Sequence, residues 1–275
     1  MKYVIAVSGG VDSVVLLDMA VRKNRKEIIV AHFEHGIRGA NSKADARFVE
    51  ALSRKYGLTC KIGYGGLGSN ASEALAREKR YNFLYKVARQ NNAQLIVAHH
   101  QDDLIETIAL NIKRGTGWRG LTPMSDKRVL RPLIGMTKQD IYNYALANSL
   151  EWVEDETNQS ARYTRNRLRK HMYRLSDLNK IALLHGVSRQ RIVRKNIESE
   201  VDKILGRSLT RYFITMIDKK TAIELLNALT NYRLTTPQLE VLLVKIKTTK
   251  DNKEIQPGAG ITIKINSSGW LCIDR

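Results

Sequence analysis

Short apolar runs alternate with longer amphipathic stretches over the first 150 residues of the chain. The apolar runs expected to form strands are 3–7, 27–32, 60–62 and 95–98. The stretches with helical length and apolar spacing are 14–20, 42–56, 70–90, 102–114 and 137–149. Strands that are almost wholly apolar and are each followed by a helix are typical of a parallel sheet covered on both faces. The pattern therefore predicts an α/β fold with a doubly wound parallel sheet.

Two of the expected helices carry recognisable end signals. Asn70 and Glu73 stand three residues apart, as the two partners of a capping box do, and predict a helix start at Asn70. The helix expected over 102–114 has acidic residues in its first turn, basic residues in its last turn and Gly115 as its stop.

The composition of the chain changes near residue 158. From residue 161 to about 205 the chain is basic and helical, and two further helices are expected over 221–232 and 237–247. The stretch 260–273 alternates apolar and polar residues around a Ser-Ser-Gly turn, which favours a β-hairpin. We therefore expect a domain over 1–158 and a basic, mainly helical second domain over 159–275 that ends in a β-hairpin.

The positive charge is concentrated in the second half. The chain has 46 Lys and Arg against 27 Asp and Glu, a net charge of +19. Residues 1–156 hold 23 basic and 17 acidic side chains, whereas residues 157–275 hold 23 basic and 10 acidic ones. Such an excess favours a polyanionic partner, and charge alone does not separate nucleic acid from an anionic membrane.

Two cysteines, Cys60 and Cys272, exclude a disulfide scaffold, a Cys-rich zinc site and a C-x-x-C redox pair, and they suit a reducing cytosol. The apolar start is too short for a signal peptide, and no stretch has the roughly 18 uninterrupted apolar residues of a membrane span. We expect a cytoplasmic protein with no membrane partner.

The loop after the first expected strand has the composition of a phosphate site. It reads Ser8-Gly9-Gly10-Val11-Asp12-Ser13 and opens a helix. Two glycines allow a tight turn close to a ligand, and the helix start directs unpaired N–H groups and a positive dipole end at it. An ordinary strand-to-helix turn explains one glycine but not this whole composition, and the Gly-Lys-Ser/Thr ending of a Walker loop is absent.

A second cluster, 99–107, follows the strand expected over 95–98, where a parallel sheet presents residues to its ligands. Helix capping explains one of Asp102 and Asp103, but not both together with Glu106 one turn further on the same side. The His32-x-x-His35 spacing after the strand expected over 27–32 is a poor one for zinc, so Mg²⁺ shared between a carboxylate and the phosphates of a ligand is the better match.

Two further motifs have competing explanations. The run 162–174 holds six Lys and Arg and no acid, which favours a polyanionic partner over a solvated helix face, where the signs are normally mixed. The run 63–68 matches the dinucleotide fingerprint G-x-G-x-x-G, but it follows a weak strand and lacks an acid about 20 residues on. We interpret it as a flexible loop over the site.

The hexapeptide 8–13 resembles the pyrophosphate loop of the N-type ATP pyrophosphatase (PP-loop) family, which has an adenine nucleotide α-hydrolase-like, Rossmann-like fold. Over about residues 2–174 the chain is similar to the tRNA(Ile)-lysidine synthases of that family. The matching blocks are 8–13, 35–38, 73–81, 99–107, 131–133, 155–158 and 165–169.

This resemblance implies a ligase that forms a carbon–nitrogen bond. The wobble cytidine of an isoleucine tRNA with a CAU anticodon is adenylated by ATP, and L-lysine then displaces AMP to give lysidine. The residues implied for ATP are Ser8, Gly9, Gly10, Val11, Asp12 and Ser13, with Arg38 offsetting charge at the phosphates. Asp102, Asp103 and Glu106 are implied to bind lysine, accept its proton or hold Mg²⁺, Asp103 being the metal ligand. Arg165, Asn166 and Arg169 are implied to bind tRNA.

Alternatives remain open at this point. The tRNA thiolases share the loop but use cysteines, and amide-forming relatives such as NAD or GMP synthetases have no need of the basic run. A non-catalytic RNA-binding protein that responds to ATP is a third alternative. The oligomeric state, a homodimer included, stays open, as do the role of 206–275 and the discrimination against methionine tRNA.

Overall fold

The computed structural model describes residues 1–23, 27–36, 40–68, 71–154, 176–206 and 209–274. These residues form two compact units, Met1–Val187 and Ser188–Arg275. The domain boundary expected after residue 158 falls within 155–175, outside the described residues.

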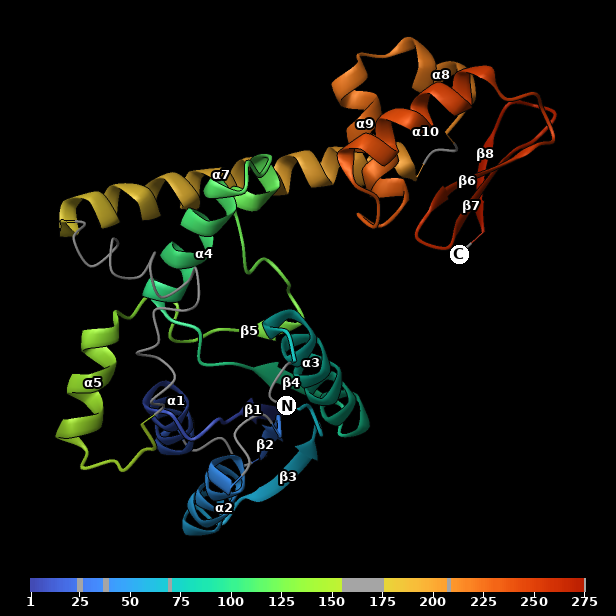
Figure 1. Ribbon diagram of the computed structural model, residues 1–275. Coiled ribbons are helices and arrows are strands. Elements are labelled where there is room, and N and C mark those ends of the chain that lie inside the picture. The colour runs from blue at the N-terminus through green and yellow to red at the C-terminus, as the bar shows by residue number, and fades with distance from the viewer. Residues whose placement is uncertain (24–26, 37–39, 69–70, 155–175, 207–208, 275) are drawn as a thin grey trace. The chain divides into compact units, whose positions relative to one another are not determined.

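The first unit is built on a five-stranded parallel sheet, as the apolar runs predicted (Figure 1). Its strands stand in the order β3-β2-β1-β4-β5 and pair in parallel throughout. The bounds are β1 Lys2–Ala6, β2 Ile28–Glu34, β3 Thr59–Tyr64, β4 Ala93–Ile96 and β5 Val129–Leu130. β5 is only two residues long, and the sequence pattern did not indicate it.

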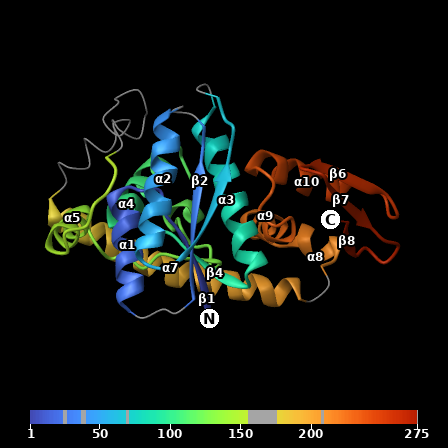
Figure 2. The ribbon, with the colours of Figure 1, turned by 90° about the horizontal axis from the view of Figure 1, so that it is seen from below.

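Helices cover both faces of this sheet, which confirms the doubly wound arrangement (Figures 1 and 2). Ile5 of β1 and Ile96 of β4 face a core shared with α1, α2 and α5, whereas the adjacent Val4 and Leu95 face α3. Burial on both faces explains why the strands are apolar at successive positions. The helices are α1 Val11–Arg22, α2 Ala40–Lys55, α3 Glu73–Gln90, α4 Gln101–Lys113 and α5 Lys138–Ala147, with a 3-10 turn at Trp118–Leu121.

The start of α3 differs from the expected one. The helix begins at Glu73, and the Ser72 side chain accepts a hydrogen bond from the backbone N–H of Leu75 at 3.2 Å. Ser72 therefore caps the helix, and the predicted capping box from Asn70 to Glu73 is wrong because Glu73 is the first helical residue.

The second unit packs helices against a small antiparallel sheet. The helices are the later part of α7 Asp177–Leu205, then α8 Arg211–Met216, α9 Lys219–Leu229 and α10 Thr236–Thr248. The strands β6 Glu254–Gly258, β7 Ile261–Ile265 and β8 Leu271–Asp274 stand in that order. β7 and β8 form an antiparallel pair within the stretch 260–273, and β6 is a third strand that the alternation did not indicate.

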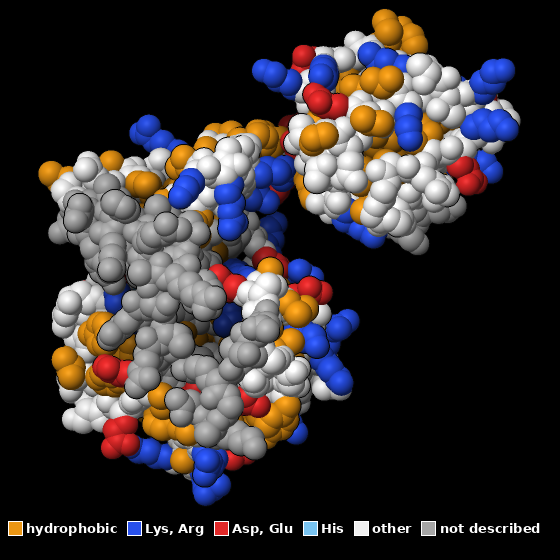
Figure 3. Space-filling model, viewed as in Figure 1, with side chains coloured by type: hydrophobic (Ala, Val, Ile, Leu, Met, Phe, Trp, Pro, Cys, Tyr) orange, Lys and Arg blue, Asp and Glu red, His pale blue; other side chains and the backbone are white. Residues whose placement is uncertain are grey.

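Two features of the described residues concern the possible partners: the distribution of Lys and Arg on the surface and the length and hydropathy of the helices. In the face seen in Figure 3, Lys and Arg side chains of the second unit are scattered rather than gathered in one place. The densest basic run of the sequence, 162–174, lies outside the described residues. No helix among the described residues is both long enough and apolar enough to cross a membrane.

Candidate active site

The strand order reverses between β1 and β4, and we refer to the region beyond their carboxyl ends as the crevice. From β1 the chain proceeds to β2 and β3 on one side, and β4 and β5 lie on the other side. In sheets of this type ligands bind at such a reversal, beyond the carboxyl ends of the two central strands. The two loops that leave these ends are 7–10 and 97–100, so both predicted clusters flank one crevice.

The loop after β1 is held by the Ser13 side chain. Ser13 Oγ accepts hydrogen bonds from the backbone N–H groups of Ser8 at 3.1 Å and Gly9 at 3.2 Å, and it donates to the carbonyl of Gly10 at 2.8 Å. Gly9 has φ +97°, a left-handed conformation that strains other residues. The loop is therefore fixed in shape, and the start of α1 at Val11 has no side-chain cap. Its free N–H groups suit an anion.

Three carboxylates meet around the His100 ring at this end of the sheet. His100 Nε2 lies 3.9 Å from Asp12 Oδ1 and 3.4 Å from Asp103 Oδ2, and Nδ1 lies 3.6 Å from Asp102 Oδ2. Asp103 also accepts from the backbone N–H of His100 at 3.1 Å, as a residue near the start of a helix can. The structure thus brings Asp12, Asp102 and Asp103 together, although Asp12 lies in the first turn of α1 and the other two in the first turn of α4.

The charges of this cluster depend on each other. Burial of His100 opposes its protonation, but Asp102, Asp103 and Asp12 outweigh that effect and raise the pKa of His100. His100 and the backbone N–H of Lys138 in turn lower the pKa of Asp102, against the effect of burial. A carboxylate with a lowered pKa stays ionised and available to bind a cation.

Lys138 belongs to this site, and the sequence analysis missed it. Its Nζ lies 2.5 Å from Asp12 Oδ1, and its backbone N–H donates to Asp102 Oδ2 at 2.7 Å. The ammonium also lies 5.0 Å from the centre of the Tyr142 ring. One local signal was present: Lys138 is the first residue of α5, where the helix dipole disfavours a cation. A lysine at that position suggests a reason other than helix stability.

Other predicted residues have different positions. Glu106 lies one turn beyond Asp103 on α4 and is buried, with 5% of its surface exposed. Arg38, Arg165, Asn166 and Arg169 lie outside the described residues.

The fingerprint-like run 63–68 is a loop only from Gly65 onward. Gly63 and Tyr64 are the last two residues of β3. Beyond them, the backbone N–H of Gly65 donates to the carbonyl of Glu34 at 2.7 Å, and that of Leu67 to the carbonyl of His35 at 2.9 Å. The run therefore starts as a strand and continues along the end of β2, where Gly63 leaves room for the Phe83 ring and Gly65 for Phe33 and the carbonyl of His35.

The carboxylate oxygens suit Mg²⁺ better than a metal bound by protein alone. Among the described residues, no three His, Cys, Asp or Glu side chains converge as a metal centre requires. Mg²⁺ commonly takes one or two carboxylates together with phosphate oxygens, and Asp12, Asp102 and Asp103 could supply the former.

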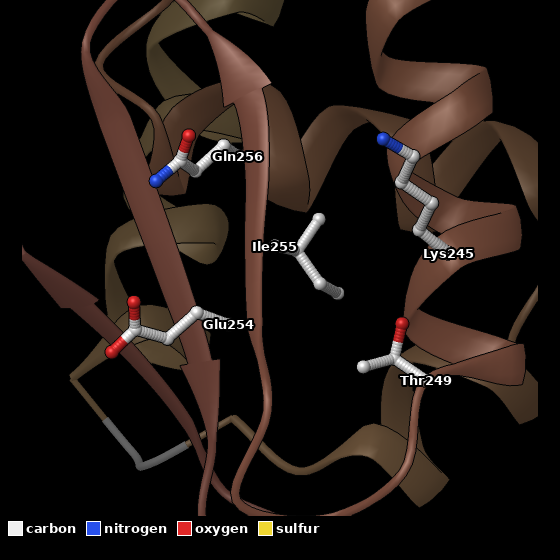
Figure 4. Close-up of a pocket in the computed structure, with 5 residues that line it drawn as sticks. All are labelled: Lys245, Thr249, Glu254, Ile255 and Gln256. Carbon is white, nitrogen blue, oxygen red and sulfur yellow. The ribbon is translucent and has the colours of Figure 1, made fainter.

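A pocket in the second unit has a different character. It lies between α10 and β6 and is lined by Lys245, Thr249, Glu254, Ile255 and Gln256 (Figure 4). None of these residues was predicted to bind ATP, lysine or tRNA, and one lysine and one glutamate do not define a ligand.

The comparison with known families rests on most of the first unit. The profile of the PP-loop domain matches residues 1–175, which include the loop 8–13 and the carboxylates around it. The chain belongs to the PP-loop domain family. Within this PP-loop domain, the sequence expectation of an adenine nucleotide α-hydrolase-like fold is confirmed.

Several curated proteins that are similar to this chain share one name. The tRNA(Ile)-lysidine synthase of Thermotoga maritima is 34% identical over 224 residues, covering 76% of this chain and 54% of that protein. The enzyme of the same name from Bacillus subtilis is 35% identical over 182 residues, covering 61% of this chain and 39% of that protein. The chain thus spans about half the length, or less, of these curated relatives.

A solved structure with the same fold is the U34-tRNA thiolase NcsA from Methanococcus maripaludis, which contains a 4Fe–4S cluster. It has a TM-score of 0.60 at 16% identity and covers 69% of this chain and 71% of that one. At this identity the likeness concerns the fold of the PP-loop domain alone.

Proposed function

We propose that the chain joins L-lysine to the wobble cytidine of an isoleucine tRNA with a CAU anticodon, at the cost of one ATP. The observation that carries the proposal is that the loop 8–13, which includes Asp12, meets Asp102 and Asp103 between β1 and β4. A phosphate site beside carboxylates suits a reaction that uses ATP together with a cationic co-substrate. The names of the relatives supply the identity of that co-substrate and of the tRNA.

The first proposed step transfers the adenylyl group. The base is unstacked into the crevice, its ring carbonyl oxygen forms a bond to the α-phosphorus of ATP, and the bond to the β-phosphate oxygen breaks. The loop 8–13 would bind the departing pyrophosphate through its N–H groups and hydroxyls, and Arg38 would offset the developing charge. Bound Mg²⁺ would neutralise phosphate charge, held by Asp103 with Asp12 or Asp102.

In the second proposed step the lysine side-chain amine replaces AMP. The amine arrives protonated and must lose a proton before its nitrogen attacks the activated ring carbon. Asp102, Asp103 and Glu106 are the carboxylates proposed to bind the ammonium and accept that proton. The carbon–nitrogen bond then forms as the carbon–oxygen bond to AMP breaks, which leaves lysidine.

The basic run of the chain is proposed to hold the tRNA. Arg165, Asn166 and Arg169 would contact its backbone, and the excess of positive charge in 157–275 favours the same partner. We infer a cytoplasmic location from the proposed tRNA substrate. Each lost phosphate contact should reduce the slope of binding against salt by about one.

A tRNA thiolase is the competing enzyme of the same fold. Cys60 lies in β3 and is half-buried, and burial raises the pKa of its thiol, which disfavours the reactive thiolate. Cys272 lies in β8, in the other unit. Cys60 thus belongs to a strand rather than to either loop of the site, and the lysine-dependent reaction is favoured.

The test is incorporation of radiolabelled lysine into total tRNA, with ATP and Mg²⁺ present or withheld. ATP-dependent label in isoleucine tRNA is the expected result. Pyrophosphate release without label would reassign the nucleophile, with sulfur the first to test. Neither product, from folded protein, would favour the non-catalytic RNA-binding alternative.

Variants connect this assay to the site. Asp12→Ala and Asp103→Ala should each abolish turnover, whereas Glu78→Ala, a change to an exposed carboxylate on α3, should not. Full turnover by Asp12→Ala would contradict the assignment of the loop.

A further inference from the structure

Arg131, just after β5, connects the segment 124–129 with His99 beyond the end of β4. Its Nη1 donates to the carbonyl oxygens of Met124 at 3.0 Å, Asp126 at 3.3 Å and Val129 at 2.9 Å. Its Nε donates to Nδ1 of His99 at 3.3 Å. Arg131 thus organises the segment before β5 with one end of its guanidinium and reaches the end of β4 with the other.

The contact with His99 decides where the imidazole carries its proton. A guanidinium has only donors and keeps its charge in proteins, so the nitrogen facing it must accept. His99 Nδ1 is therefore unprotonated, and the proton of the neutral ring is on Nε2. Among the described residues the one side-chain hydrogen bond seen for His99 is to Nδ1. The Nε2–H can therefore donate to a ligand.

The surroundings of His99 keep the ring neutral. Burial has the largest effect, and the positive charges of Arg77, Arg131, Arg80 and His100 act in the same direction, which lowers the pKa of His99 to about 3. Arg77 and Arg80 come from α3 and lie 4.9 and 5.4 Å from the centre of the Tyr81 ring. His99 is therefore a neutral donor among cations, next in sequence to the residue at the centre of the carboxylate cluster.

We propose that Arg131 is a positioning residue that holds His99 as the neutral tautomer with its proton on Nε2, aimed at an anionic oxygen of the substrate. Such a donor stabilises charge that develops on a phosphate oxygen without giving up its proton. The catalytic role of His99 rests on the proposed function, whereas the position of its ring proton does not. A purely structural role for Arg131, as a tie for the segment 124–129, is the competing explanation.

The first test measures the tautomer in the wild-type protein. Two-bond ¹⁵N–¹H spectra of protein labelled at its six histidines report which ring nitrogen carries the proton, and the His99 signals are those missing from His99→Gln. We expect an unprotonated Nδ1 and a protonated Nε2, unchanged between pH 7.5 and 5.5. A proton on Nδ1, or titration within that range, would overturn the proposal.

The second test is a double-mutant cycle on pyrophosphate release. Arg131→Met should lower kcat at least about tenfold with KM for ATP within about twofold, because the donor acts on charge in the transition state. The same change made in His99→Gln should have almost no further effect, since Arg131 acts through His99. Additive losses would show the structural role instead.

The matched control is Arg128→Met. Arg128 lies in the same segment and pairs with Asp126 at 2.9 Å, but it is exposed and does not contact His99. It should retain wild-type kcat. If the wild-type protein releases no pyrophosphate, the proposed function fails while the spectra still decide the tautomer.

Discussion

Lys138 Nζ lies 2.5 Å from Asp12 Oδ1, a contact between residues 126 positions apart in the sequence. It joins the first turn of α5 to the first turn of α1, at the crevice between β1 and β4. The same lysine donates its backbone N–H to Asp102, so one residue offsets the charge of two carboxylates. A site that binds ATP phosphates needs positive charge beside its carboxylates, because uncompensated carboxylates repel phosphates.

Removal of the Lys138 charge should therefore weaken the reaction. In Lys138→Met we expect kcat/KM for ATP, measured by pyrophosphate release, to fall at least about tenfold, or ~1.4 kcal/mol. The control is Lys113→Met, which removes an exposed lysine from the last turn of α4. Equal kcat/KM values for the two variants would remove Lys138 from the site.

A buried carboxylate provides a matched pair of variants. Asp18 is 2% exposed and accepts hydrogen bonds from Tyr56 Oη at 2.8 Å and Tyr144 Oη at 2.9 Å. Tyr56→Phe and Tyr144→Phe should each lower the free energy of unfolding by about 1 kcal/mol. Only Tyr144 lies on α5 with Lys138, so only Tyr144→Phe should also raise KM for ATP. An equal KM for ATP in both variants would refute the link between Tyr144 and the site. The loss of stability is measured in parallel by urea denaturation.

Gly63→Ala separates packing from nucleotide binding in the fingerprint-like run. A Cβ at Gly63 would stand 2.5 Å from Cδ2 of the Phe83 ring, so the ring or the strand must shift. We expect about 1–3 kcal/mol of destabilisation in urea and an unchanged KM for ATP. Gly135→Ala is the control, because no heavy atom lies within 4 Å of its added Cβ and its φ is not positive. A raised KM with unchanged stability would restore a role in binding.

The pH dependence of stability should reveal the buried neutral histidines. Burial lowers the pKa of His32, and burial with neighbouring arginines lowers that of His99 to about 3. Between pH 6 and 5 an unfolded histidine takes up a proton that the folded one refuses, so stability falls as the pH falls. Urea denaturation should show a loss of about 1 kcal/mol more for wild type than for His99→Gln over this interval. Equal losses would show that His99 titrates normally in the folded protein.

Local pattern was enough to predict the parallel sheet and to single out the loop 8–13 and the carboxylates after β4, because each has a signal within a few residues. Local pattern failed for β5, because two residues are too few to show the alternation of a strand. It also failed for Ser72 as the cap of α3, because Asn70 and Glu73 have the spacing of a capping box as well. Lys138 and the contact of Arg131 with His99 depend on the order of the strands. No window of sequence shows which residues that order brings together.

The same strand order has a consequence for synthesis of the chain. β1 lies in the middle of the sheet, and its register with β4 pairs Lys2 with Ala93. One edge of β1 therefore stays unpaired until about 90 more residues have been synthesised, which takes roughly 5–18 s at ~5–20 residues per second. During that interval the nascent chain exposes an unpaired edge, which is where aggregation begins. Chaperone demand should accordingly be highest before β4 leaves the ribosome.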